Sequence, residues 1–157
     1  MKRIILDTNL LLLWIVGLTD RSLIGKHKRT KTFEIADFDL LVSVLSGYHE
    51  IVVTPHILTE TSNLLSQTTA SSATAMRAKL SDFLKTQREE FEPSSDVMKH
   101  KTFFRLGLTD CAIIRLVEKN IPLITADLDL YLAASAVKHN SNVINFTHLR
   151  QARMFGG

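Results

Sequence analysis

Several residue types that mark secreted and membrane proteins are scarce in this 157-residue sequence. Its single cysteine, Cys111, excludes an internal disulfide, so nothing indicates a secreted, disulfide-rich scaffold. The longest apolar run, residues 10–18, is about half as long as a membrane span requires. No small-residue cleavage pattern of a signal peptide follows that run. We therefore expect a cytoplasmic protein with no part in a membrane.

The charges are nearly balanced in number but unevenly placed. A formal net charge of +3 is mild, and by itself it is weak evidence for a nucleic-acid partner. The cations gather in one polar stretch, at Arg21, Lys26, Lys28, Arg29 and Lys31. Polar residues and glycine in this stretch predict an exposed basic loop.

Short apolar segments alternate with helical patterns along the whole chain. The expected strands are residues 3–6, 50–54, 121–125 and 142–146, with a short strand at 91–92. The expected helices are 10–18, 32–45, 55–66, 73–89, 110–119 (with Thr109 as its N-cap) and 127–138, and a short helix closes the chain. Strands separated by helices of this length form βαβ units with a parallel sheet. The sequence therefore predicts one α/β domain over residues 1–157.

Four acidic residues occupy positions that are costly for a charge unless something pairs with it. Asp7 and Asp127 each follow an expected strand directly, at the edge where parallel sheets form their sites. Glu60 lies toward the apolar face of the expected helix 55–66. Asp110 opens a helix whose other face is strongly apolar. Each acid points toward a site, although none does so decisively alone.

Each of these acids also has a plainer explanation. Asp7 and Asp127 are suited to cap the helices that follow them, and Asp110 is favoured by a helix dipole. Glu60 can pack its stem while its carboxylate reaches water. Taken together, however, four unpaired carboxylates would repel one another and raise their pKa values. Mg²⁺ or Mn²⁺ would relieve that repulsion and activate a water toward a phosphate. No histidine or cysteine cluster offers a zinc alternative.

In order and spacing, four motifs resemble those of the PIN-domain family of nucleases: Ile5-Leu6-Asp7-Thr8-Asn9, Thr59-Glu60, Leu108-Thr109-Asp110-Cys111-Ala112 and Ile124-Thr125-Ala126-Asp127. The resemblance covers nearly the whole chain. It implies a three-layer α/β/α sandwich with a central parallel sheet of about five strands. It also implies an endoribonuclease that depends on Mg²⁺ or Mn²⁺.

The resemblance also implies which residues form the site. The acidic quartet would be Asp7, Glu60, Asp110 and Asp127, with Asp7, Asp110 and Asp127 as metal ligands. Thr8 and Asn9 would support the site by hydrogen bonding. Asp129 is a second acid near Asp127, and we prefer Asp127 because it directly follows Thr-Ala at the strand end.

Partners follow from the same resemblance and from the basic loop. Small bacterial and archaeal members of the family are often VapC-type toxins held inactive by an antitoxin protein. The basic stretch 21–31 and the helical region 67–92 make this chain longer, which weakens the antitoxin expectation more than the nuclease one. The apolar helices and the small residues 70–75 favour a homodimer. RNA would be held outside the acidic pocket by Lys26, Lys28, Arg29 and Lys31, unless that loop serves only solubility.

Three other functions compete with a nuclease. A dehalogenase-like phosphatase needs a second acid where this chain has Asn9. A receiver-type signalling domain needs a lysine after a late strand, and residues 125–127 supply none. A non-catalytic PIN-like scaffold that binds RNA or a protein stays open.

Overall fold

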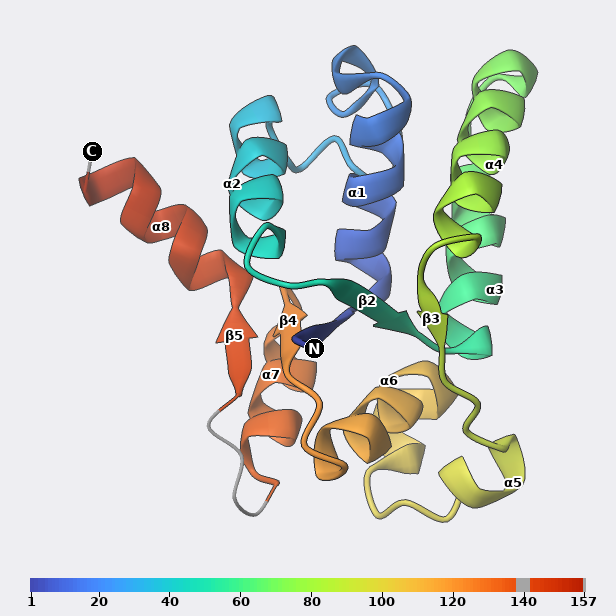
Figure 1. Ribbon diagram of the computed structural model, residues 1–157, viewed down its shortest axis with the longest axis vertical. Helices are drawn as coiled ribbons and strands as arrows, with labels where there is room; N and C mark the ends of the chain where they lie inside the picture. Colours follow the sequence, from blue (N-terminus) through green and yellow to red (C-terminus); the bar gives the residue numbers. More distant parts are fainter. Residues whose placement is uncertain (138–141, 157) are drawn as a thin grey trace.

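A five-stranded parallel sheet forms the centre of the computed structural model, which describes residues 1–137 and 142–156 (Figure 1). The strands lie in the order β3-β2-β1-β4-β5. They are β1 (Arg3–Leu6), β2 (Glu50–Val53), β3 (Arg88–Glu89), β4 (Leu123–Thr125) and β5 (Val143–Asn145). In this order the chain winds outward from β1 to β3, then crosses over β1 to reach β4 and β5. The strand order therefore reverses between β1 and β4, where α/β sheets place their sites.

Helices cover both faces of the sheet (Figure 1). They are α1 (Thr8–Thr19), the 3-10 turn η1 (Arg21–Leu23), α2 (Ile35–Leu45), α3 (Pro55–Leu65), α4 (Ala70–Leu84), α5 (Ser94–Val97), α6 (Phe103–Glu118), α7 (Leu128–Ser135) and α8 (Phe146–Gly156). Helices α1 to α4 lie on one face and α6 and α7 on the other. This arrangement confirms the expected α/β/α sandwich and its five parallel strands.

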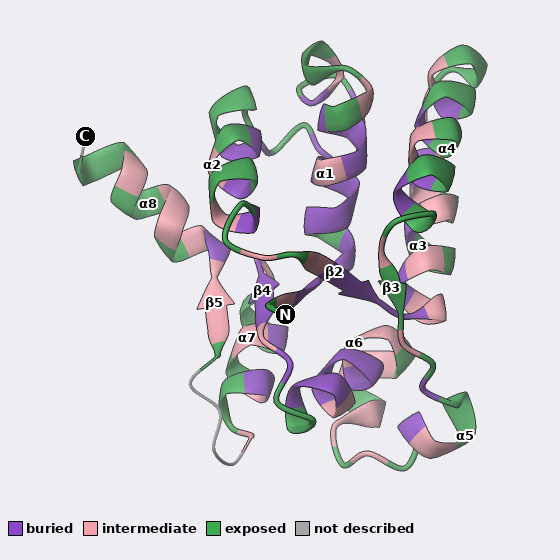
Figure 2. Cartoon of the chain, viewed as in Figure 1, coloured by how far each residue is buried: buried purple, intermediate pink, exposed green. Residues whose placement is uncertain are grey.

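The core is built around β1 and α1, which Figure 2 shows buried between the outer helices. Helix α1 is apolar on nearly all sides because α2, α3 and α4 pack around it. One close approach depends on a glycine: a Cβ atom at Gly17 would come within 2.2 Å of the Phe38 ring. No helix in residues 1–137 or 142–156 is long and apolar enough to cross a membrane.

Most predicted elements are present, but several boundaries were wrong. The expected helix 73–89 is α4, which ends at Leu84 and leaves Arg88–Glu89 to form β3. The strand expected at 91–92 is absent there, and Glu92 is instead buried in ion pairs with Arg115 and Lys119. The helix expected at 127–138 is α7, which ends at Ser135, and position 138 lies outside the described residues.

The basic stretch 21–31 is only partly the exposed loop that the sequence predicts. Its four candidate RNA-binding cations are exposed: Lys26, Lys28, Arg29 and Lys31. Between them, however, Ile24, His27 and Thr30 are buried. The Thr30 hydroxyl donates to the Ile24 carbonyl at 2.7 Å, and His27 lies 3.2 Å from the Leu65 carbonyl. The segment is therefore attached to α3 and presents its cations outward.

Candidate metal centre

The two strands on either side of the order reversal each end at an aspartate. Strands β1 and β4 pair in parallel, with Leu6 opposite Ile124. Asp7 follows β1, and Asp127 follows β4 by one residue. Because both strands run the same way, their last residues reach the same edge of the sheet.

Asp7 is held rigidly at this edge. One carboxylate oxygen accepts the Leu10 N–H at 2.9 Å, which caps α1. The other accepts the Thr125 hydroxyl and, at 3.2 Å, the Ala126 N–H. The side chain is buried, and that burial raises the pKa of Asp7 to about 6 despite these hydrogen bonds. Capping therefore describes only part of what Asp7 does, because its second oxygen ties β1 to β4.

Asp127 caps α7 and faces the same pocket. Its Oδ1 accepts the Leu130 N–H at 3.0 Å, and its own N–H donates to the Thr125 hydroxyl oxygen at 3.0 Å. Asp127 lines the pocket with Asp7, whereas Asp129 is exposed in the first turn of α7. The structure thus separates the two acids that the sequence left in competition.

Asp110 reaches the pocket because α6 changes direction just before it. Gly107 has φ 84° and ψ −178°, a backbone conformation that only glycine adopts readily. Helix α6 is interrupted at Gly107, so the helix expected at 110–119 is its second segment, which begins just before Asp110 and includes Thr109 instead of being capped by it. The Thr109 hydroxyl instead donates to Glu60 at 2.7 Å.

Asp110 experiences the charge of every other acid in the site. Burial raises the pKa of Asp110 to about 7, and the negative charges of Asp127, Asp7, Glu60 and Asp129 add to the effect. Within the described part of the chain, its carboxylate accepts no hydrogen bond. A half-buried carboxylate with only like charges around it favours a bound cation.

The acids surround a pocket of about 330 Å³. Its polar lining consists of Asp7, Thr8, Asn9, Glu60, Thr109, Asp110 and Asp127. No lysine or arginine is among the residues that line it. The Thr8 hydroxyl is buried there without a hydrogen-bond partner in the described chain, whereas Asn9 is exposed. The lining therefore offers only oxygen donors, amide nitrogens and negative charge.

The donor set suits a hard divalent cation, although the side chains are not gathered around a single point. Carboxylate and hydroxyl oxygens are the ligands that Mg²⁺ and Mn²⁺ prefer. Among residues 1–137 and 142–156, however, no three acidic, histidine or cysteine side chains converge closely enough to hold an ion. Asp127 and Glu60 each use one carboxylate oxygen in a hydrogen bond and keep the other. The residues fit such an ion chemically, and ligation would require side-chain rotations.

The four candidate RNA-binding cations lie away from this pocket. Helix α1 begins at the pocket with Thr8 and ends at Thr19, just before the basic stretch (Figure 1). Its twelve residues span about 18 Å at the usual helical rise. The structure therefore brings the acids together and leaves Lys26, Lys28, Arg29 and Lys31 at the other end of α1. Their contact with RNA stays a prediction.

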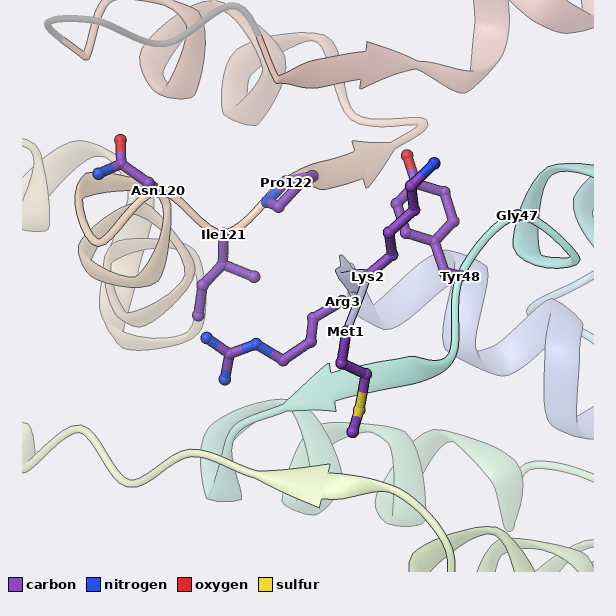
Figure 3. Close-up of a pocket in the computed structure, with 8 residues that line it drawn as sticks. All are labelled: Met1, Lys2, Arg3, Gly47, Tyr48, Asn120, Ile121 and Pro122. Carbon is purple, nitrogen blue, oxygen red and sulfur yellow. The ribbon is translucent and has the colours of Figure 1, made fainter.

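A second and larger pocket lies at the opposite edge of the sheet (Figure 3). It measures about 550 Å³. It is lined by the first residues of the chain and by the residues that lead into β2 and β4. Lys2, Arg3 and Tyr48 contribute its polar side chains together with Asn120. Figure 3 shows the side chains of Lys2, just before β1, and Arg3, its first residue, pointing in different directions.

Models of known protein families do not match this chain, and neither does any curated protein. The resemblance to PIN-domain nucleases therefore stays a prediction that is based on the motifs.

Two residues of the site were missed by sequence reasoning. Thr125 joins Asp7 to Asp127 through one hydroxyl, and Gly107 sets the direction of the chain into Asp110. A glycine inside an apolar helical pattern was the available signal for Gly107. Thr125 stood in the motif Ile124-Thr125-Ala126-Asp127, but the motif did not assign its hydroxyl a role in the site.

Proposed function

We propose that this protein is a metal-dependent endoribonuclease that hydrolyses phosphodiester bonds in RNA. One observation carries the proposal: Asp110 lies among the charges of Asp7, Glu60 and Asp127, in a pocket whose lining includes no lysine or arginine. Repulsion within such a cluster lowers the stability of the folded chain at neutral pH unless a cation offsets it, and Mg²⁺ or Mn²⁺ fits its oxygen donors. The motif resemblance supports the same reaction.

The acids take different roles in this proposal. Asp7, Asp110 and Asp127 would hold the cation, which when bound would lower the pKa of an attacking water and offset charge on the phosphate. Asp7 is the fixed member, since three hydrogen bonds orient it. Glu60 is exposed at the rim and keeps one carboxylate oxygen unbonded in the described chain, so it would accept the proton of the water.

The supporting residues are Thr8, Asn9 and Thr125. The unpartnered Thr8 hydroxyl would donate to a phosphate oxygen after a small rotation, and Asn9 is exposed beside it. Thr125 keeps Asp7 and Asp127 in register across β1 and β4. Asp129 would act only through its charge, because it does not line the pocket.

RNA would be attracted by the exposed basic stretch and not by the acidic pocket, which repels phosphates. Lys26, Lys28 and Lys31 would neutralise phosphates far from the cut, while Arg29 is partly engaged by a 2.8 Å hydrogen bond to Gln67. An antitoxin protein and a second copy of the chain remain proposed partners, in keeping with the toxin-like motifs.

A non-catalytic scaffold with this fold is the second candidate. One observation favours it: in the described residues no three potential ligands converge on a single point. In that alternative RNA would bind without being cut, and added Mn²⁺ would change neither binding nor stability.

The test is cleavage of fluorescent single-stranded RNA with Mg²⁺, with Mn²⁺ and with EDTA. Asp7→Asn and Asp110→Asn should each lose activity, because each removes a proposed ligand. Asp82→Asn is the matched control, since Asp82 is an exposed aspartate on α4 that pairs only with Lys85. Cleavage in EDTA, or cleavage that survives both substitutions, would contradict the mechanism. RNA binding without cutting would favour the scaffold.

A further inference from the structure

A groove of about 490 Å³ continues from the acidic pocket along α3. The two hollows share Glu60, Leu108 and Thr109. Beyond these residues the groove is lined by His56 and Asn63 of α3 and by Ser94 at the start of α5. A chain bound with one phosphate at the acids would therefore have its neighbouring nucleotide at this groove.

One face of α3 supplies most of the groove. His56, Thr59, Glu60 and Asn63 are spaced by three or four residues, so they lie along the same side of the helix. Glu60 faces both hollows, and the other three side chains are neutral hydrogen-bonding groups. This face of α3 is a polar stripe that begins at the proposed catalytic acid.

The chemistry of the groove suits a nucleobase better than a phosphate. No lysine or arginine lines it, so it lacks the cations that hold phosphates. Pro55 and Leu108 give it apolar walls beside the polar side chains, of which only Glu60 is acidic. Apolar walls with a few placed hydrogen-bonding groups are typical of sites for flat ligands and unstacked bases.

The hydrogen bonding of His56 fixes what the groove offers. Its Nδ1 is buried without a partner in the described chain, and its Nε2 lies 2.8 Å from Ser94 Oγ. We assign the His56 proton to Nε2, because a buried N–H without an acceptor is rarer than a buried bare nitrogen. His56 then donates to Ser94, and the Ser94 hydroxyl proton is left to donate to a ligand.

We infer that this groove binds the base of a nucleotide adjacent to the phosphate that is cut. Ser94 donates a hydrogen bond to an acceptor on the edge of that base, and His56 is the residue that positions Ser94. Leu108 and Pro55 pack against the faces of the base. The consequence is a base preference next to the cleavage site, set by a neutral donor and not by a charge.

The role of this subsite rests on the proposed nuclease function, but its occupancy can be measured without cleavage. Affinity for fluorescent single-stranded RNA is measured in an Asp110→Asn background. Thr59→Trp fills the groove and should weaken binding about tenfold, as expected for the loss of one stacked base. The matched control is Thr74→Trp, a substitution of an exposed threonine on α4, which should change affinity less than about twofold.

The difference in affinity between bases is a second measurement, and general damage to the fold would lower all affinities without changing that difference. Affinities for short homopolymers of U, A and C should differ for the parent protein, and Ser94→Ala and His56→Ala should both reduce that difference. Equal affinities of Thr59→Trp and Thr74→Trp would overturn the subsite. Groove-dependent binding by a protein that, with Asp110 intact, cuts no RNA in Mn²⁺ would support the subsite and overturn the nuclease.

Discussion

The two edges of the sheet carry pockets of opposite character. At the carboxyl edge, acids from four separate segments line one small pocket. Burial first, and then the charges of the other acids, raise the pKa of Asp110 to about 7. At the amino edge, the larger pocket contains Lys2 and Arg3, but the two side chains diverge. Arg3 already pairs with Glu90 at 3.4 Å. The size of a pocket therefore does not point to a metal site, whereas several like charges lining one pocket do.

The reason for this difference lies in the topology. Asp7 and Asp127 are brought together because neighbouring parallel strands end at the same edge, and helices α3 and α6, which contact each other, carry Glu60 and Asp110 to the same pocket. The cations at the amino edge are Lys2, which directly precedes β1, and Arg3, its first residue, and successive side chains of an extended chain point to opposite sides. A change at the carboxyl edge should therefore affect function, and a change at the amino edge should not.

The largest expected effect separates Asp127 from Asp129. Asp127→Asn should lower metal-dependent RNA cleavage by about 10² or more, because it removes a proposed ligand from the pocket. Asp129→Asn should keep most of the activity, because Asp129 is exposed and lies outside the pocket lining. Lys2→Ala at the amino edge is the control for a charged residue in a pocket. Comparable losses in all three variants would erase the distinction between the two edges.

The next effect tests the turn that directs Asp110 into the pocket. Gly107→Ala should lower the free energy of unfolding by about 1–3 kcal/mol, since a side chain strains the backbone at φ 84°. Cleavage should fall about tenfold, because a small displacement of a catalytic group is costly. Gly25→Ala is the matched control, at an open position without a positive φ. Urea unfolding and RNA cleavage measure the two effects. An unchanged Gly107→Ala protein would show that the direction of α6 is not set there.

A smaller effect concerns stability against pH without metal. Asp7 and Asp110 have pKa values near 6 and 7 in the folded chain, above the ordinary 3.8. The folded state therefore holds protons that the unfolded state releases, and the free energy of unfolding should fall as pH rises from about 4 to 7. We expect a decrease of at least about 1 kcal/mol.

Denaturation in EDTA across this pH range measures that decrease. Mn²⁺ should reverse it at pH 7, since a ligand that binds only the folded state stabilises it. Asp110→Asn should flatten the dependence, whereas Lys2→Ala should leave it unchanged. A stability that rises from pH 4 to 7 in EDTA would mean that the acids are not crowded in solution.

Part of the fold could be predicted from the sequence alone. The positions of β1, β2, β4 and β5 followed from short apolar segments, although β3 was missed, and parallel pairing placed Asp7 and Asp127 at one edge. Other features depend on contacts between distant parts of the chain. Buried Asp37, for example, pairs with Arg150 at 2.9 Å across 113 positions, and nothing near either residue signals that contact.

Boundaries within the second half failed for a local reason. The helix expected at 110–119 is the second segment of α6, and a first helical segment at residues 103–106 joins it across the kink at Gly107. Positive φ at Gly107 lets two helical segments join at an angle, and a periodicity pattern does not encode that angle. The sequence was therefore enough to name Asp110 as a candidate. Only the structure shows how the turn at Gly107 directs it into the pocket.

The smallest expected effect is at the amino edge. Arg3→Ala removes the pair with Glu90, but Glu90 keeps Arg88 at 2.9 Å, and both partners of the lost pair are partly exposed. We expect a loss of less than about 0.5 kcal/mol in urea unfolding, and no change in cleavage. Arg88→Ala is the comparison, because it removes the shorter of the two pairs with the same acid. If Arg3→Ala instead weakened RNA binding severalfold, the amino edge would also contact RNA. The two edges would then serve the same function in different ways, one by cutting RNA and the other by binding it.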